Sequence, residues 1–145
     1  GHIINISSLF GLTAQPTQSA YNATKFAVRG FTESLRQELD IEKCGVSALC
    51  VHPGGIRTNI ANAAKMNDSL RSLGMNPEKS AKTFNKLLRC PPEEAARQIL
   101  EAVQKDKRRL LIGNDAKAID LMQRILPTGY QKVTALASKL GKGKN

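Results

Sequence analysis

The sequence predicts an α/β fold in which the strands of a parallel sheet alternate with helices. Residues 2–6 form a short run rich in isoleucine, a helical pattern follows over about residues 20–42, and residues 46–51 form a second apolar run. A strand, a long helix and another strand make a crossover unit, which joins parallel strands through a right-handed connection. A further apolar run at residues 109–113 predicts a third strand.

The first strand, His2 to Ile6, is expected to be buried because it is rich in isoleucine, and polar Ser7 and Ser8 end it. A single strand needs a sheet to join. The sequence begins with Gly1 rather than methionine. We therefore expect it to start inside a domain whose first half precedes it, with a processed or tagged N-terminus as the alternative.

The long helix has small and apolar residues at steps of three or four, and Gly45 is expected to end it. These helix positions are Ala23, Ala27, Gly30, Phe31, Ser34 and Leu35. The second strand, residues 46–51, is expected to stop at Pro53-Gly54-Gly55.

Residues 59–91 are polar, basic and poor in strand formers. Two weak helical patterns cover residues 61–73 and 77–88. A segment of this length between core elements is often a lid or a binding loop.

The remainder of the chain again shows regular patterns. Pro92 and the acidic residues after it suit the start of a helix. Asn114 or Asp115 is expected to cap a further helix after the third strand, and a last amphipathic helix covers about residues 130–140. The apolar positions of the first two helices are Ala95, Ala96, Ile99, Leu100 and Val103, then Ala118, Ile119, Met122, Ile125 and Leu126.

The net charge of +10 lies almost entirely in residues 61–145, which hold 17 basic and eight acidic side chains. A basic module for nucleic acid or lipid is therefore one alternative. Aromatic residues make up only 4% of the chain, so bases would find few stacking platforms, and no zinc-finger or RNA-recognition pattern is present. We expect no nucleic-acid partner and no association with a membrane surface.

The three cysteines, Cys44, Cys50 and Cys90, include no C-x-x-C pair. This spacing fits neither a disulfide framework nor a metal site, and it suits a reducing compartment such as the cytoplasm.

Tyr21 and Lys25 lie four residues apart at the start of the long helix, so they share one helix face. A phenol alone is a poor acid–base catalyst at neutral pH, but a nearby ammonium favours the phenolate. Such a pair can exchange a proton with an alcohol. Ser8 ends the first strand, at the sheet edge where ligands bind in parallel sheets, and residues 53–58 follow the second strand at the same edge.

A set of motifs at specific spacing closely resembles the short-chain dehydrogenase/reductase family. The motifs are Asn5-Ile6-Ser7-Ser8, Gly11, Pro16, Tyr21-Asn22-Ala23-Thr24-Lys25 and Pro53-Gly54-Gly55-Ile56-Arg57-Thr58. The resemblance covers essentially the whole chain as the C-terminal half of that family's Rossmann-type, doubly wound parallel sheet, with about three strands. It implies a partial NAD(P)-binding domain over residues 1–145, divided into a catalytic segment (1–58), a substrate lid (59–91) and a C-terminal part (92–145).

The resemblance also implies roles for individual residues. Tyr21 would be the general acid/base, Lys25 would hold the nicotinamide ribose, and Ser8 would hydrogen-bond the substrate carbonyl. The implied cofactor-binding residues are Tyr21, Lys25, Pro53, Gly54, Ile56 and Thr58. The cofactor would be NAD or NADP, the substrate a small carbonyl or alcohol, and the full-length form a homo-oligomer that packs through the small residues of the long helix. No metal is implied.

One part of the family pattern is missing from these residues. The phosphate-binding T-G-x-x-x-G-x-G motif and the N-N-A-G segment are absent, so the pyrophosphate would have no helix N-terminus to bind. We therefore expect an oxidoreductase fragment that is inactive alone. The other alternative is a non-catalytic remnant that acts by pairing with a related subunit.

Overall fold

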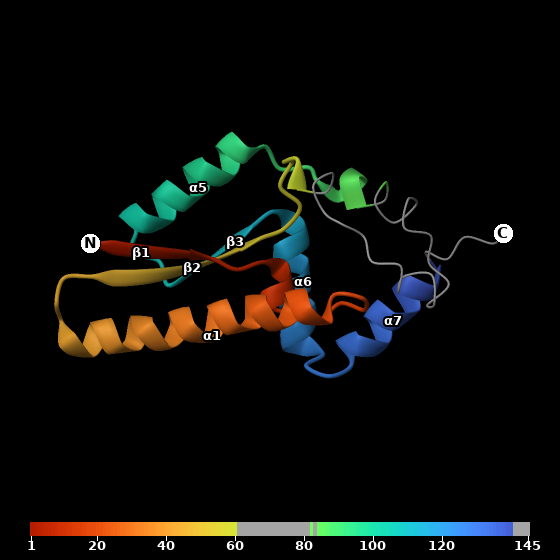
Figure 1. Cartoon of the computed structure of the whole chain (residues 1–145), viewed down its shortest axis with the longest axis horizontal. Coiled ribbons are helices and arrows are strands. Elements are labelled where there is room, and N and C mark those ends of the chain that lie inside the picture. The colour runs from red at the N-terminus through yellow and green to blue at the C-terminus, as the bar shows by residue number, and fades with distance from the viewer. Residues whose placement is uncertain (61–81, 83, 141–145) are drawn as a thin grey trace.

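The computed structural model describes residues 1–60, 82 and 84–140. Its sheet has three parallel strands in the order β1-β2-β3: β1 (His2–Ile6), β2 (Ser47–Pro53) and β3 (Arg109–Ile112) (Figure 1). In the register, Ile4 lies opposite Leu49 and His52 lies opposite Leu111. The predicted α/β fold and its parallel sheet are confirmed, with β2 running on through Pro53.

Two helices cover opposite faces of this sheet (Figure 1). They are α1 (Ser19–Glu42), which forms the crossover between β1 and β2, and α5 (Pro92–Gln104), which leads into β3. A short 3-10 turn, η1 (Leu9–Gly11), joins β1 to α1. The helices α6 (Asn114–Ile125) and α7 (Tyr130–Leu140) follow β3. Each helix predicted from the described residues is therefore present.

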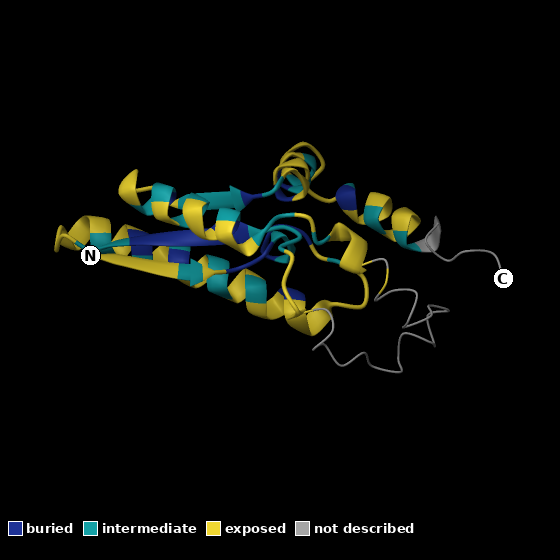
Figure 2. Ribbon diagram, turned by 90° about the horizontal axis from the view of Figure 1, so that it is seen from above, coloured by how far each residue is buried: buried dark blue, intermediate teal, exposed yellow. Residues whose placement is uncertain are grey.

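The main apolar core lies between the sheet and α5. It consists of Leu49, Val51, Ala95, Ala102 and Ile112. β2 is buried because it pairs on both sides, as its dark blue ribbon shows in Figure 2. On the opposite face of β2, the guanidinium of α1 residue Arg36 donates to the Ala48 carbonyl and pairs with both carboxylate oxygens of Asp106.

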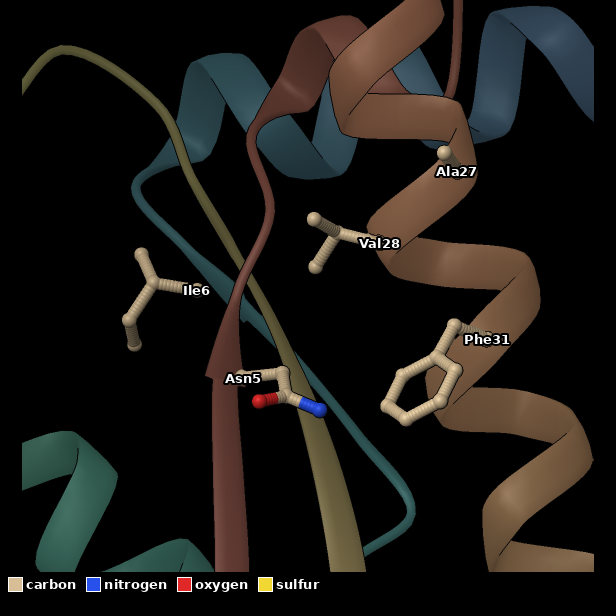
Figure 3. A pocket seen from close by; sticks show the side chains of 5 residues that line it. All are labelled: Asn5, Ile6, Ala27, Val28 and Phe31. Carbon is tan, nitrogen blue, oxygen red and sulfur yellow. The ribbon is translucent and has the colours of Figure 1, made fainter.

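The expected burial of β1 is wrong. Ile3 and Ile4 are each 38% exposed and Ile6 is 46% exposed, because in the described part of the chain β1 pairs with β2 alone. An open groove of about 450 Å³ separates β1 from α1. Figure 3 shows Val28 and Phe31 pointing from α1 toward β1, with Asn5 opposite them.

Three helix predictions also need correction. Gly113, with φ +95°, occupies the N-cap of α6, so neither Asn114 nor Asp115 caps that helix. The buried residues of α6 are Ala116 and Asp120, whereas the predicted apolar positions Ala118, Ile125 and Leu126 are exposed. Leu100 of α5 is exposed as well. Apolar periodicity alone does not show how much of a helix face a neighbouring element covers.

The predicted helix over residues 61–73 lies outside the described residues. Of the predicted helix over 77–88, residues 82 and 84–88 are described; residues 82 and 84–87 are helical, whereas residue 88 is not. No helix within the described ranges has the length and apolar character that crossing a membrane requires. All three cysteines are free, and burial raises the pKa of the Cys50 thiol.

Candidate active site

Ser8 lies directly after β1, where its side chain caps the short turn η1. The Ser8 Oγ accepts a hydrogen bond from the backbone N–H of Phe10 at 3.2 Å. The Ser8 carbonyl accepts from the Gly11 N–H at 2.9 Å and lies 2.9 Å from Nδ1 of His52. Hydrogen bonds at the side chain and the carbonyl therefore hold Ser8 at the carboxyl end of the strand.

Tyr21 and Lys25 occupy the first two turns of α1. The Lys25 Nζ lies 5.5 Å from the centre of the Tyr21 ring and donates to the Ile6 carbonyl at 3.1 Å. Tyr21 is 37% exposed, so its phenol can be reached from solvent. The structure thus brings an ammonium and a phenol to the carboxyl end of β1, as their spacing predicts.

Phe10 connects these two parts of the site. Its ring packs edge-to-face against Tyr21 with centroids 6.2 Å apart, while its backbone N–H holds the Ser8 hydroxyl. Within the described residues, the Ser8 and Tyr21 side chains share no hydrogen bond. Phe10 was not predicted, because its residue type and its place in an expected loop carry no signal of a role.

A tight contact fixes the start of α1 against the end of β1. The Ser7 Oγ donates to the Lys25 carbonyl at 2.8 Å. A Cβ on Gly11 would lie 2.2 Å from that Oγ and 2.8 Å from the same carbonyl oxygen. Gly11 therefore allows a close approach that a larger residue would prevent.

The segment that begins with the last residue of β2, residues 53–58, is held by hydrogen bonds from two directions. The Gly54 N–H donates to the Ile112 carbonyl of β3 at 2.8 Å. The Gly55 carbonyl accepts from the N–H groups of Arg89 and Cys90 at 2.9 and 3.0 Å, and Ile56 forms an isolated parallel bridge with Cys90. The end of the 59–91 segment is thus attached to this loop.

Pro53 ends β2 opposite Ile112, and Thr58 ends the loop. Thr58 is exposed, and its N–H donates to the Ile56 carbonyl at 2.9 Å. Because β1 and β2 are parallel, Ser8 and residues 53–58 leave the sheet at the same edge. Asp115 joins them, since its Oδ2 accepts from the Gly55 N–H at 2.7 Å. The sequence indicated Asp115 only as a possible helix cap.

His52 is fully buried, and burial lowers the pKa of its imidazole. Its Nδ1 faces the Ser8 carbonyl rather than the Ser8 hydroxyl, so the two residues do not form a nucleophile–base pair. The carbonyl can only accept, so Nδ1 carries the proton, and Nε2 has no hydrogen-bond partner among the described residues. No group of three potential metal ligands occurs in the described ranges.

Comparison with known proteins places the chain beside oxidoreductases. A family model described as short chain dehydrogenase matches residues 1–69. The putative oxidoreductase SadH of Mycobacterium tuberculosis is 48% identical over 136 residues, which cover 93% of this chain and 48% of SadH. Dehydrogenase/reductase SDR family member 11 of Bos taurus is 37% identical over 102 residues, covering 69% of this chain and 37% of that protein. The chain thus spans about half or less of the length of these relatives.

Solved structures resemble the chain over similar lengths. A short-chain dehydrogenase from Streptomyces avermitilis matches with a TM-score of 0.67 and 26% identity, covering 94% of this chain and 52% of that one. A short chain dehydrogenase from Mycobacterium paratuberculosis bound to NAD matches with a TM-score of 0.53 and 25% identity, covering 77% of this chain and 43% of that one.

Proposed function

The chain belongs to the short-chain dehydrogenase/reductase family, and from this membership we propose that it is the catalytic half of an NAD(P)-dependent oxidoreductase. The reaction is reversible hydride transfer between a nicotinamide and a carbonyl/alcohol pair. The observation that carries the proposal is the Lys25 ammonium 5.5 Å from the Tyr21 ring at the carboxyl end of β1.

Tyr21 is the proton carrier of the proposed site. Its solvent-accessible phenol donates a proton to the oxygen of a carbonyl as that oxygen becomes an alkoxide, and it takes the proton back from an alcohol. The neighbouring Lys25 ammonium places a positive charge beside the ring of this proton carrier. Lys25 uses one N–H on the Ile6 carbonyl, and an ammonium has two more to offer to ribose hydroxyls.

Ser8 orients the substrate oxygen in this proposal. Its Oγ accepts from the Phe10 N–H, so the hydroxyl hydrogen remains to be donated. Within the described part of the chain, no group accepts that hydrogen. A substrate carbonyl at the sheet edge would supply the missing acceptor.

The residues present fit the nicotinamide end of a dinucleotide cofactor. Tyr21 and Thr58 are exposed and Lys25 is half-buried, so donors for a carboxamide and a ribose stand at one sheet edge, beside Pro53, Gly54 and Ile56. The bound nicotinamide supplies or accepts the hydride. NAD in the Mycobacterium paratuberculosis relative supports this choice of cofactor. The chain contains no glycine-rich phosphate motif, so on its own it should bind NAD or NADP poorly and be inactive.

The charge pattern supports an enzyme over a basic binding module. Several arginines are already engaged in ion pairs with carboxylates, which reduces their availability to phosphate groups. These arginines are Arg29, Arg36, Arg97, Arg108, Arg109 and Arg124.

We propose a homo-oligomer for the full-length protein, in the cytoplasm, acting on a small molecule. Four small residues of α1, Ala23, Ala27, Gly30 and Ser34, are exposed rather than packed on the chain's own sheet. A Cβ on Gly30 would meet nothing within 4 Å. A face of this kind allows another helix to approach closely.

A fusion protein tests the proposed function. The N-terminal half of SadH is joined to this chain. Oxidation of NADH or NADPH by the fusion is then followed with a panel of aldehydes and ketones. We expect the fusion to turn over and the chain alone to be inactive. Tyr21→Phe and Lys25→Met in the fusion should each lower kcat about 10²–10⁴-fold. Lys43→Met, at the other end of α1, is the matched control.

Two results would contradict the proposal. A folded Tyr21→Phe fusion with unchanged turnover would remove Tyr21 from the chemistry. Steady-state carbonyl reduction by the chain alone would show that the expected inactivity is wrong. Circular dichroism of each variant separates loss of chemistry from loss of fold.

A further inference from the structure

We propose that Asp115 is a positioning residue that holds the loop of residues 53–58 in the shape that receives the nicotinamide. The inference rests on the proposed function, because it assigns to that loop the cofactor contact. Asp115 acts through the backbone of Gly55 and does not itself touch the reacting atoms.

The Asp115 carboxylate joins two segments that lie far apart in the sequence. Its Oδ2 accepts from the Gly55 N–H at 2.7 Å and its Oδ1 accepts from the Ala116 N–H at 2.9 Å. A carboxylate can accept both bonds at once, and bonds to a charged acceptor are stronger than neutral ones. The loop after β2 is therefore attached to the first turn of α6.

Two glycines make room for this carboxylate. A Cβ on Gly54 would lie 2.1–2.3 Å from the carboxylate atoms of Asp115. A Cβ on Gly113 would lie 2.3 Å from Oδ1, and Gly113 also has φ +95°. The family resemblance implies that Gly54 binds the cofactor. The structure adds a reason for glycine at this position, since the space that a side chain at position 54 would need is occupied by Asp115.

The backbone of Gly55 is held at both of its polar groups. Its N–H bonds to Asp115, and its carbonyl accepts from Arg89 and Cys90. Ile56 follows directly and is paired with Cys90. Loss of the carboxylate would release the N–H side of Gly55 and let the Ile56 and Thr58 backbone shift away from the position that a nicotinamide carboxamide requires.

Hydrogen exchange at the Gly55 amide tests the contact without any cofactor. In the chain, Asp115→Ala should speed exchange of that amide about 10- to 100-fold, as expected for a lost bond to a charged group. Asp115→Asn should have a smaller effect, because an amide has one acceptor oxygen for two N–H donors. Glu93→Gln is the control, since Glu93 is an exposed acid in the first turn of α5.

A second variant keeps the test valid if Asp115→Ala does not fold. Gly54→Ala should displace the carboxylate and raise Gly55 exchange to a similar extent. In the Asp115→Ala background the added methyl group should have no further effect on Gly55 exchange. Independent, additive effects of the two substitutions would overturn the proposal, as would unchanged Gly55 exchange in Asp115→Ala.

Titration with nicotinamide mononucleotide, followed by amide chemical shifts, tests the consequence for the cofactor. This probe carries the nicotinamide, its ribose and a single phosphate, and so avoids the missing pyrophosphate site. We expect shifts at residues 53–58 in the parent chain and affinity about tenfold weaker in Asp115→Ala, with Glu93→Gln unchanged. Equal affinity for nicotinamide mononucleotide in the parent and in Asp115→Ala would overturn the positioning role of Asp115 and leave the proposed function standing. No binding by the parent would overturn the proposed function, and the positioning role with it.

Discussion

The side chain of Ser7 donates a hydrogen bond to the backbone carbonyl of Lys25 at 2.8 Å. Ser7 is the first residue after β1, and Lys25 carries the ammonium beside Tyr21. The bond therefore sets the distance between the end of the strand and the helix turn that bears the proposed proton carrier. Gly11 lies against both atoms of this bond, with no space for a side chain.

Gly11→Ala should therefore destabilise the chain. The new methyl group would overlap a backbone carbonyl, which cannot rotate away, and overpacking of this kind costs about 1–3 kcal/mol. Gly30→Ala is the matched control, because a Cβ there meets nothing and alanine favours a helix interior by roughly 0.5–1 kcal/mol. In urea denaturation, the free energy of unfolding should decrease in Gly11→Ala and increase in Gly30→Ala. Changes of the same sign in the two variants would contradict the packing described for Gly11.

Replacing each of the two tyrosines by phenylalanine should have a different effect, on stability at Tyr130 and on activity at Tyr21. The Tyr130 hydroxyl accepts from the Ala14 N–H at 3.1 Å and ties α7 to the loop before α1. Tyr130→Phe leaves that donor unpaired and should lower the unfolding free energy by about 1–2 kcal/mol. Tyr21→Phe should leave stability nearly unchanged and lower kcat of the fusion about 10²–10⁴-fold. Denaturation and kinetics of both variants check this, and the reverse pattern would count against the role proposed for Tyr21.

The buried His52 should make the chain sensitive to acid. Burial lowers its pKa in the folded state, so the unfolded chain takes up the proton first as the pH falls. The unfolding free energy should therefore decrease below the unfolded value of about 6.5, by at most roughly 1.4 kcal/mol per pH unit.

Urea denaturation at several pH values measures this effect. His52→Gln should flatten the dependence between about pH 7 and pH 5, since glutamine does not titrate in that range. His2→Gln is the control, because His2 is the other histidine of the chain and is exposed. If the free energy of unfolding of His52→Gln still decreases between about pH 7 and pH 5, the acid sensitivity belongs to other groups.

The exposed isoleucines of β1 should make the isolated chain self-associate. An unpaired strand edge with apolar side chains is a template for pairing with another chain. Phe31 lines the groove beside β1, whereas Leu100 lies on α5, and each is 63% exposed. Phe31→Lys should reduce concentration-dependent association and Leu100→Lys should not. Sedimentation velocity measures both, and a well-dispersed NMR spectrum of a monomeric parent chain would contradict the expectation.

Local sequence patterns were sufficient to predict the regular elements and the Tyr21–Lys25 pair. The positions of β1, α1, α5 and β3 along the chain follow from apolar runs, periodicity and turn residues, all of which act over a few residues. Tyr21 and Lys25 share a face because they are one helical turn apart, whatever the helix packs against. The family resemblance added the roles of Ser8 and of residues 53–58, which the residue pattern alone does not specify.

Only the tertiary structure determined which residues far apart in the sequence meet. Phe10 contacts Tyr21, His52 faces the Ser8 carbonyl, and Asp115 holds Gly55 across 60 positions of the chain. Such contacts depend on strand register and on how helices pack, which residue type alone does not encode. The exposure of β1 was missed for the same reason, because an isoleucine-rich strand is apolar whether or not a neighbouring strand covers its second edge.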